Sequence, residues 1–229
     1  MQPHILDNAG WASLSGPHAS FAKVVGLARR YPVDVSPFGA IADHKDPMAW
    51  RDLAELIGPG QRIVLSRSGL EVPEAWRTPD GGSGVQLVGD EVEGLADDDA
   101  LQLNANDVPE MLDLVSRTKP GPFLSRTIEL GGYLGFRIDG KLVAMAGCRV
   151  RPAGWREISA VCTDPLHQGK GLSSRLVRAV VANIRSEGDI PFLHASVTNI
   201  NAIRLYEKLG FRLRIHTTFA VVQAPALPA

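Results

Sequence analysis

This sequence of 229 residues has few cysteines, a net charge close to zero and no long apolar run. Its two cysteines, Cys148 and Cys162, sit inside apolar segments, which is typical of core thiols in a reducing compartment and not of a disulfide framework. No cysteine–histidine cluster has the spacing of a zinc site, so we expect no metal. Because 24 basic and 25 acidic residues give a formal net charge of −1, nothing predicts general binding to nucleic acid.

Signals for membrane insertion and export are missing from the pattern as well. No apolar run approaches the roughly 18 residues of a membrane-spanning helix. The first eight residues, MQPHILDN, have neither the basic start nor the apolar core of a signal peptide. We therefore expect a cytoplasmic protein that does not bind membranes and whose partners are small molecules.

Two composition breaks divide the chain. The glycine-rich segment Asp80–Gly84 predicts a loop, and the acidic stretch Asp90–Asp99 is typical of a solvated linker. We place a boundary near residue 100, between an N-terminal α/β unit at 1–100 and a larger domain at 101–222. Residues 223–229, rich in alanine and proline, are expected to form a loose tail.

The N-terminal unit contains short elements. We predict helices at Ala19–Arg30 and Pro47–Ile57 and strands at Arg62–Ser66 and Val85–Val88. The second helix has an apolar face, made by Trp50, Leu53 and Ile57, that must be buried. Because an isolated unit of about 100 residues is only modestly stable, we expect it to pack against the rest of the chain.

After residue 100, strands and helices alternate. The predicted strands are 132–137, 142–150, 157–163, 192–197 and 211–222, and the predicted helices are 107–116, 172–185 and 200–209. In the second of these helices, Leu172, Leu176, Val180 and Ile184 recur at i+4 steps and give a wide buried stripe. The order of elements predicts a mixed α/β fold, with a mixed sheet covered by helices.

The most informative segment is 161–174, VCTDPLHQGKGLSS, where a strand runs into a glycine-rich turn that opens the long helix. Gly169 and Gly171 lack a Cβ, so the main chain there can approach a ligand closely. The first N–H groups of a helix have no intrahelical partner. Together with the helix dipole they form an anion site suited to a pyrophosphate.

Three phosphate-binding patterns compete here with a plain tight turn. A P-loop needs glycine where Asp164 stands, and a dinucleotide fingerprint needs glycine where Ser174 stands. The third pattern, Gln/Arg-x-x-Gly-x-Gly/Ala, matches Gln168, Gly171 and, imperfectly, the small Ser173. Because it matches this third pattern, the segment resembles the phosphate-binding motif of the GNAT superfamily of acyl-CoA-dependent N-acetyltransferases.

A second motif strengthens the resemblance. Residues 199–211, NINAIRLYEKLGF, are similar to the superfamily signature Asn-x-x-Ala-x-x-x-Tyr-x-x-x-Gly-Phe. Asn199 suits a helix N-cap, and Gly210 suits the left-handed position after a helix. The resemblance implies a GNAT fold at 101–222, with a splayed mixed sheet and flanking helices. The N-terminal extension could be a degenerate GNAT-like half, but it has no glycine-rich strand-to-helix loop, so one cofactor site per chain is expected.

The resemblance implies acetyl-CoA as co-substrate. In the family, the strand carrying Val161 and Thr163 splays from its neighbour, the pantetheine arm pairs with its main chain in the gap, and the amides of 168–174 hold the pyrophosphate. The contacts carried over in this way are those of Val161, Cys162, Thr163, Gln168, Gly169, Lys170, Gly171, Leu172, Ser173, Ser174, Asn199 and Tyr206. Lys170 or a neighbouring basic residue would screen the 3′-phosphate, the alternative being a solvated loop charge.

Catalytic roles follow from the same resemblance. Tyr206 matches the family position whose hydroxyl faces the cofactor sulfur, so we expect a general acid; the alternative is a core tyrosine. Glu157 resembles the base of the histone-acetylating branch. Strand alternation would place Glu157, Ser159, Val161 and Thr163 on one face, with the Glu157 pKa raised by partial desolvation. A water chain and His194 are the other candidate bases, and Glu157 could also be a solvated strand-end charge.

The acceptor is left open by the sequence. Arg126 and Glu129 lie in the segment that usually lines the acceptor site of the family, and we expect the N-terminal unit to help close that site. We expect transfer of an acetyl group to a primary amine of a small molecule or amino acid. The alternatives are a protein or peptide amine, or a non-catalytic acyl-CoA-binding module. Both a monomer and a homodimer are compatible with the sequence.

Overall fold

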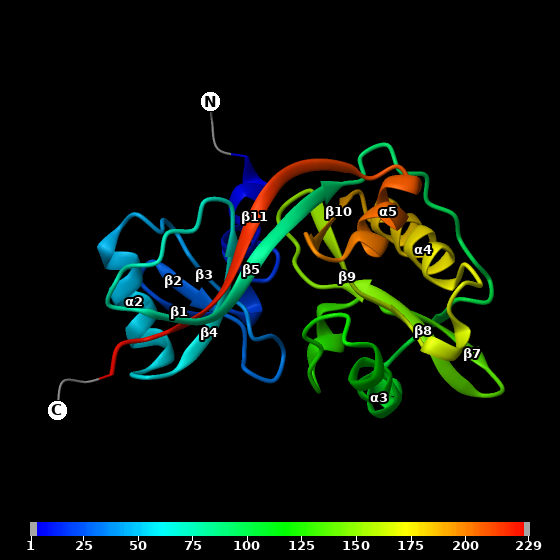
Figure 1. The fold of residues 1–229 in the computed structure, drawn as a ribbon, viewed down its shortest axis with the longest axis horizontal. Helices are drawn as coiled ribbons and strands as arrows, with labels where there is room; N and C mark the ends of the chain where they lie inside the picture. Colours follow the sequence, from blue (N-terminus) through cyan, green and yellow to red (C-terminus); the bar gives the residue numbers. More distant parts are fainter. Residues whose placement is uncertain (1–3, 227–229) are drawn as a thin grey trace.

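The computed structural model describes residues 4–226 and confirms a mixed α/β architecture (Figure 1). Within these residues, an eight-stranded sheet has the order β4-β11-β5-β10-β9-β8-β7-β6, and a second sheet has the order β1-β2-β3. The strands are β1 Lys23–Val25, β2 Ala28–Arg30, β3 Gly39–Ile41, β4 Arg62–Arg67, β5 Arg77–Val88, β6 Leu101–Gln102, β7 Leu134–Ile138, β8 Lys141–Cys148, β9 Trp155–Thr163, β10 Ile190–Ser196 and β11 Arg212–Gln223. The helices are α1 Ala9–Leu14, α2 Pro47–Ile57, α3 Val108–Thr118, α4 Leu172–Ser186 and α5 Ile200–Lys208, and the 3₁₀ turns used below are η1 Ile5–Asn8 and η5 Pro165–His167.

Helices α4 and α5 cover one face of the large sheet, and α3 covers the other. The buried stripe of α4 packs on Ile158 of β9 and Leu193 of β10, as the i+4 spacing of its apolar residues predicts. On the opposite face, Met111 and Leu114 of α3 pack against Cys162. In the part of the chain that the structure describes, no helix is both long and apolar enough to span a bilayer.

The predicted loop at Asp80–Gly84 is wrong, because these residues lie inside β5 and pair with β11. The glycines mark a close approach of two strands and not a turn. A Cβ on Gly81 would lie 2.8 Å from the main-chain oxygen of Phe219, and one on Gly82 would lie 2.7 Å from the Phe219 ring. Glycine therefore lets β11 pack tightly along β5, and these two strands run from one half of the molecule to the other (Figure 1).

The predicted helix at Ala19–Arg30 is also wrong. The segment forms the β1–β2 hairpin, which turns at Gly26 and Leu27 with Val25 paired to Ala28. Gly26 has a φ of 44°, and a Cβ there would collide with the Asp52 carboxylate. A left-handed glycine at the first position of a two-residue turn favours a hairpin over a helix. The other predicted helix of this unit is confirmed as α2.

The large sheet continues across residue 100. Strand β5 precedes that position, yet it lies between β10 and β11. Residues at the start of the chain pack on the same sheet, since Leu6 and Ala9 share an apolar cluster with Val88 and Phe192. The expected packing of the N-terminal unit against the rest of the chain is confirmed, whereas the boundary near residue 100 stays a prediction.

The predicted loose tail is wrong for residues 223–225. Gln223 is the last residue of β11, and the buried Ala224 donates its N–H to the Gln61 oxygen at 2.9 Å. The Pro225 oxygen accepts a hydrogen bond from the N–H of Gly60. The strand thus ends in further pairing with the β4 side of the sheet, and residues 227–229 of the predicted tail lie outside the described residues.

Candidate active site

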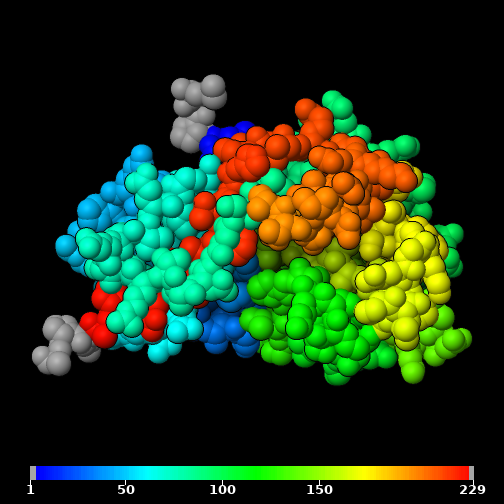
Figure 2. All heavy atoms as spheres, viewed as in Figure 1, coloured from blue at the N-terminus to red at the C-terminus, as the bar shows by residue number. Residues whose placement is uncertain are grey.

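Strands β9 and β10 part in the middle of the large sheet. Their parallel pairing ends at Ile158 and Leu193. Beyond that pair, β9 continues next to β8 alone, and β10 continues next to β5 alone. The result is the gap between two splayed strands that the family resemblance implies. In Figure 2 a hollow is visible between the orange atoms of the β10–α5 region and the green atoms of the α3 region.

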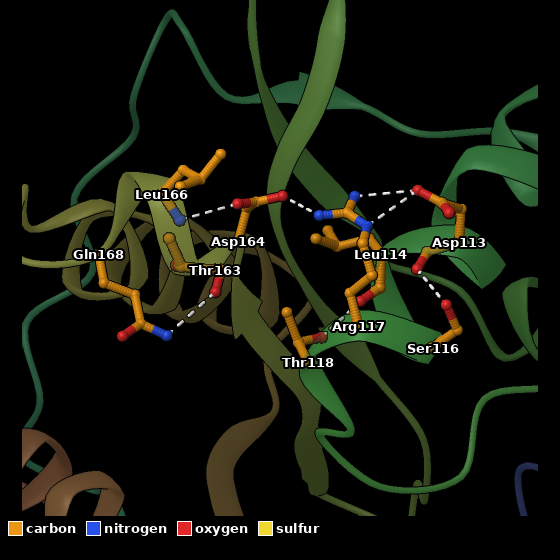
Figure 3. A network of polar contacts seen from close by, with 9 residues as sticks. All are labelled: Asp113, Leu114, Ser116, Arg117, Thr118, Thr163, Asp164, Leu166 and Gln168. Atoms are coloured by element: carbon orange, nitrogen blue, oxygen red, sulfur yellow. Dashed lines mark hydrogen bonds and ion pairs between the residues drawn. The ribbon is translucent and has the colours of Figure 1, made fainter.

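The open edge of β9 presents main-chain groups to this gap. The N–H of Asp164 donates to the Val143 oxygen of β8 at 2.8 Å. Because successive residues of a strand direct their N–H and C=O groups to opposite sides, those of Thr163 and Val161 are directed away from β8, toward the gap. At the two positions that the family resemblance implies, the strand edge has no partner strand, and the Thr163 oxygen accepts only a long hydrogen bond of 3.5 Å from the Gln168 side chain (Figure 3).

A β-bulge at Ala160 changes which side chains share a face. Ala160 has a φ of 54°, and the register slips there, because Met145 pairs with Cys162 while Gly147 pairs with Ser159. Ile158 and Val161 both pack toward α4, and Ala160 packs toward α3. The expected common face for Glu157, Ser159, Val161 and Thr163 is therefore wrong, since one extra residue in the strand reverses the alternation.

The loop after β9 carries a row of free N–H groups. Gly169 and Gly171 have φ values of 76° and 75°, which only glycine adopts without strain. Gly171 is the N-cap of α4 and offers no side-chain cap. Among the described residues, none accepts a hydrogen bond from the main-chain N–H groups of 168–174. With the helix dipole behind them, these groups form an anion site.

The base of this loop is fixed to α3 (Figure 3). Arg117 forms an ion pair with Asp164 and holds Asp113 with its Nε and second terminal nitrogen at 3.1 and 2.9 Å. The other Asp164 oxygen accepts from the N–H of Leu166 at 2.9 Å. Asp164, which rules out a P-loop in the sequence, thus positions the start of the loop. The hydroxyls of Thr163 and Ser173 lie 2.8 Å apart and join strand to helix.

A cavity of about 270 Å³ lies beside the anion loop, between α4 and α5. Its basic lining residues are Arg175, Arg178 and Lys208, and Ser174 connects it to the loop. Arg175 is held by Asp97 and Asp99 at 2.7 and 2.8 Å. The acidic stretch predicted as linker therefore pairs with α4. Lys170 is exposed on the loop and does not line this cavity.

Tyr206 of α5 lies in the apolar core beside the gap. It is 7% exposed and packs edge-on against Phe211, with the ring centroids 5.9 Å apart. Burial raises the pKa of Tyr206 to about 12, with a smaller effect from Cys162. The hydroxyl thus carries its proton at neutral pH. Cys162 turns its thiol toward α3 and pairs with Met145 of β8, so neither its side chain nor its main-chain N–H and C=O groups face the gap.

Glu157 is fully buried, at 1% exposure, and is paired on both oxygens. Arg149 binds it through Nε at 3.1 Å and a terminal nitrogen at 2.7 Å, and His194 Nδ1 lies 2.8 Å from Oε1. Burial alone would raise its pKa, but the Arg149 charge and the hydrogen bonds from His194 and Arg149 lower it to about 2. The expected raised pKa is wrong, because an ion pair outweighs desolvation.

The remaining predicted residues are less central. Asn199 caps α5 through its side chain, which accepts from the N–H of Ala202 at 3.2 Å, as predicted. Arg126 and Glu129 bind each other, and Arg126 also binds Asp34 of the N-terminal unit at 3.1 Å. This pairing connects the two parts of the chain at a half-exposed surface.

Sequence reasoning missed two polar residues of the site, the buried Gln86 and Arg149, whose side chain is 15% exposed. Gln86 of β5 lies 3.0 Å from the Nε2 of His194. The sequence contains one weak indication of each residue's role. Gln86 is the polar residue within the apolar run at 85–88, and Arg149 directly follows the apolar run at 142–148. A polar residue in such a place needs a buried partner, but the sequence does not say which.

Replacing Glu157 with glutamine tests the buried ion pair. The variant leaves Arg149 buried without its counter-charge, so we expect a loss of about 3–5 kcal/mol in the free energy of unfolding. Because the Glu157 pKa is lowered in the folded state, its contribution is complete above about pH 5 and is lost as pH falls toward 2. Unfolding in denaturant from pH 7 to pH 3 should therefore show a flatter pH dependence for Glu157→Gln than for the wild type.

The control for this measurement is Glu110→Gln. Glu110 pairs with Arg137 at the surface, where its side chain is 45% exposed, and such pairs contribute less than about 1 kcal/mol. Equal losses in the two variants would contradict a stabilising role for the buried pair.

Comparisons with known proteins agree with this geometry. Residues 133–220 match the family model described as FR47-like protein. A putative acetyltransferase from the GNAT family of Novosphingobium aromaticivorans is 38% identical, with 98% of this chain and 100% of that chain covered and a TM-score of 0.89. A GCN5-related N-acetyltransferase from Kribbella flavida is 15% identical, with 94% and 96% covered and a TM-score of 0.61, and shares the fold.

One curated relative adds a shorter match. The N-alpha-acetyltransferase RimI of Mycobacterium tuberculosis is 33% identical over 84 residues, which is 35% of this chain and 51% of that protein. The similarity to the Novosphingobium protein, in contrast, extends over nearly the whole chain and includes the N-terminal unit. The chain therefore belongs to the GNAT family of acetyltransferases.

Proposed function

We propose that this protein transfers the acetyl group of acetyl-CoA to a primary amine by direct attack. The observation that carries the proposal is the gap between β9 and β10, which leads from unpaired strand edge at Val161 and Thr163 to the free N–H groups of 168–174. A pantetheine arm ending in a pyrophosphate matches an open strand edge followed by an anion site.

In this proposal the main chain of Val161 and Thr163 pairs with the pantetheine amides, and residues 168–174 bind the pyrophosphate. The cavity beside the loop receives the adenosine 3′-phosphate, with Arg178 and Lys208 as its counter-charges. All three side chains are exposed, but only Arg178 and Lys208 line the cavity, so we assign the 3′-phosphate to them and not to Lys170.

Tyr206 is our proposed general acid. When the amine nitrogen bonds to the thioester carbon, the carbon–sulfur bond breaks and sulfur leaves with its electron pair. A protonated hydroxyl beside the gap can supply the proton that this thiolate needs. The structure supports this assignment in two ways: Tyr206 lies next to the open strands, and burial keeps its proton in place at neutral pH.

Glu157 is better suited to positioning than to proton removal. With a pKa of about 2, its carboxylate has too little affinity for a proton to be an effective base near neutral pH. We propose that it holds Arg149 and His194 in place below the point where β9 and β10 part.

We propose further that the N-terminal unit forms one wall of the acceptor site. Thr127, in the segment before β7, donates its hydroxyl to the Val35 oxygen at 2.6 Å, and the N–H of Arg126 donates to the Asp34 oxygen at 3.0 Å. These contacts fix the N-terminal unit beside the segment that lines the acceptor site in relatives of this fold.

Two acceptor classes fit this chemistry. Our first choice is a small amine or amino acid. The second is the α-amine of a protein, favoured by the 33% identity to an N-alpha-acetyltransferase over 84 residues. A panel of amines and peptides, read by thiol release from acetyl-CoA, distinguishes them. Absence of transfer to any acceptor would contradict the proposed enzyme and favour an acyl-CoA-binding module.

Gly171→Val tests the anion loop. Valine at a φ of 75° strains the turn and moves the N–H groups of the loop, so acetyl-CoA affinity should fall by at least tenfold. The matched control is Gly188→Val, at a φ of 81° beyond the other end of α4, where a Cβ also meets open space. It carries similar strain and should bind acetyl-CoA normally. Calorimetry giving equal affinities for both variants would refute the loop assignment.

Tyr206→Phe tests the proposed acid. The substitution keeps the ring packed against Phe211 and removes the hydroxyl alone, so acetyl-CoA affinity should hardly change. Turnover should fall by about 100- to 10,000-fold, the range expected for a positioned acid or base. The measurement is kcat on the best acceptor, together with calorimetric affinity for the cofactor. Wild-type turnover in this variant would exclude Tyr206 from the mechanism.

A further inference from the structure

The polar groups at the closed end of the gap form one connected network. His194 is the first residue of β10 beyond its last pairing with β9, and it contacts Glu157 on one side and Gln86 on the other. Gln86 is also bound by Arg214 of β11, which in turn binds Asp7 of η1 at 2.6 Å. The network thus joins elements that lie far apart in the sequence.

The hydrogen bonds of Gln86 fix the direction of its amide. Its nitrogen lies 3.0 Å from the main-chain oxygen of Leu6, so it must donate there, and its oxygen accepts from Nε of Arg214. A reversed amide would place donor against donor at Arg214 and acceptor against acceptor at Leu6. Both contacts therefore require the same orientation.

This orientation determines the tautomer of His194. The Gln86 nitrogen donates its second proton to Nε2 of His194 at 3.0 Å, so Nε2 presents its lone pair. The ring proton then sits on Nδ1 and is donated to Oε1 of Glu157 at 2.8 Å. Both ring nitrogens are occupied, and a proton added at Nε2 would face the N–H of Gln86.

None of the groups that face His194 from the surrounding elements accepts a proton near neutral pH. A small cavity of about 30 Å³ beside it is lined by Arg149, Glu157, Tyr31 and Ser66. Arg149 and Glu157 neutralise each other. Burial raises the pKa of Tyr31, and Arg214 on β11 is balanced by Asp7. Among the described residues, the carboxylates of this network, Glu157 and Asp7, are therefore each paired with an arginine.

We infer that the acceptor must enter the gap as a neutral amine, which makes the substrate class an amine of low basicity, such as the α-amine of an amino acid derivative, and not a lysine side chain. This inference rests on the proposed acetyl transfer. The proton balance agrees with it. A neutral amine gives one proton from nitrogen as Tyr206 gives one to sulfur, so the hydroxyl is restored and no proton is left over. A protonated amine would leave one extra proton, which needs a base.

The difference between the two amine classes is large. An α-amine has a pKa of about 8 and a lysine side chain about 10.4, so at pH 7 roughly a tenth of the first and well under a thousandth of the second is neutral. For otherwise similar acceptors, kcat/KM at pH 7 should favour the α-amine by about 250-fold.

Two isomeric probes test the inference on the wild-type protein. Nε-acetyl-lysinamide has a free α-amine, and Nα-acetyl-lysinamide has a free side-chain amine. With saturating acetyl-CoA, we expect kcat/KM for the first to rise to a plateau with its midpoint near pH 8. For the second it should rise about tenfold per pH unit from pH 7 to 9 with no plateau. A midpoint below pH 8 that both acceptors share would overturn the inference, because it would belong to a base in the protein.

Two further results keep the outcomes distinguishable. Nitrogen-15 spectra of His194 at pH 8 should show the proton on Nδ1, and a proton on Nε2 would overturn the inference without any reference to activity. In Gln86→Leu, Nε2 loses its donor, so a midpoint common to both probes should appear. Transfer to neither probe at any pH would overturn the proposed function and, with it, this inference.

Discussion

The end of the β9–β10 pairing at Ile158 and Leu193 is the feature on which the rest of the site depends. A central pair of strands that stays joined would bury its main-chain groups in the sheet. Here the two strands part, each keeping only its outer neighbour, and the main chain of Val161 and Thr163 has no partner strand on the side of the gap. The bulge at Ala160 adds a residue to β9 at the same place and directs Val161 toward α4.

The parted strands need support from elsewhere, and much of it comes from the N-terminal unit. Strand β5 pairs with the free side of β10, and its Gln86 fixes the His194 ring at the closed end of the gap. The ion pair between Glu157 and Arg149 lies below that ring. A buried charge is stable only when it is paired and hydrogen-bonded, so this end of the site is rigid and electrically balanced.

The sequence predicted the elements whose signals are local. The α4 stripe, the glycine-rich turn before α4 and the Asn199 cap follow from rules that involve a few neighbouring residues. The failures involve distant partners. The glycines at 81 and 82 are compatible both with a turn and with a strand that packs closely on its neighbour. The position of Phe219 on β11 determines which of the two forms. The direction of the Glu157 pKa shift could not be predicted, because it depends on Arg149 and His194. Neither the glycine-rich motif nor the motif at 199–211 includes these two residues. The glutamine that fixes His194 lies 108 residues before it.

Amide hydrogen exchange with and without acetyl-CoA tests most directly whether the cofactor occupies the gap between β9 and β10. If it does, saturating acetyl-CoA slows exchange at Val161, Thr163 and the amides of 168–174; the amides of 168–174 have no acceptor within residues 4–226. Strand β8 should change little, because its amides are already paired with β7 and β9. Unchanged exchange at these positions, with protection confined to another part of the molecule, would contradict the proposed binding site.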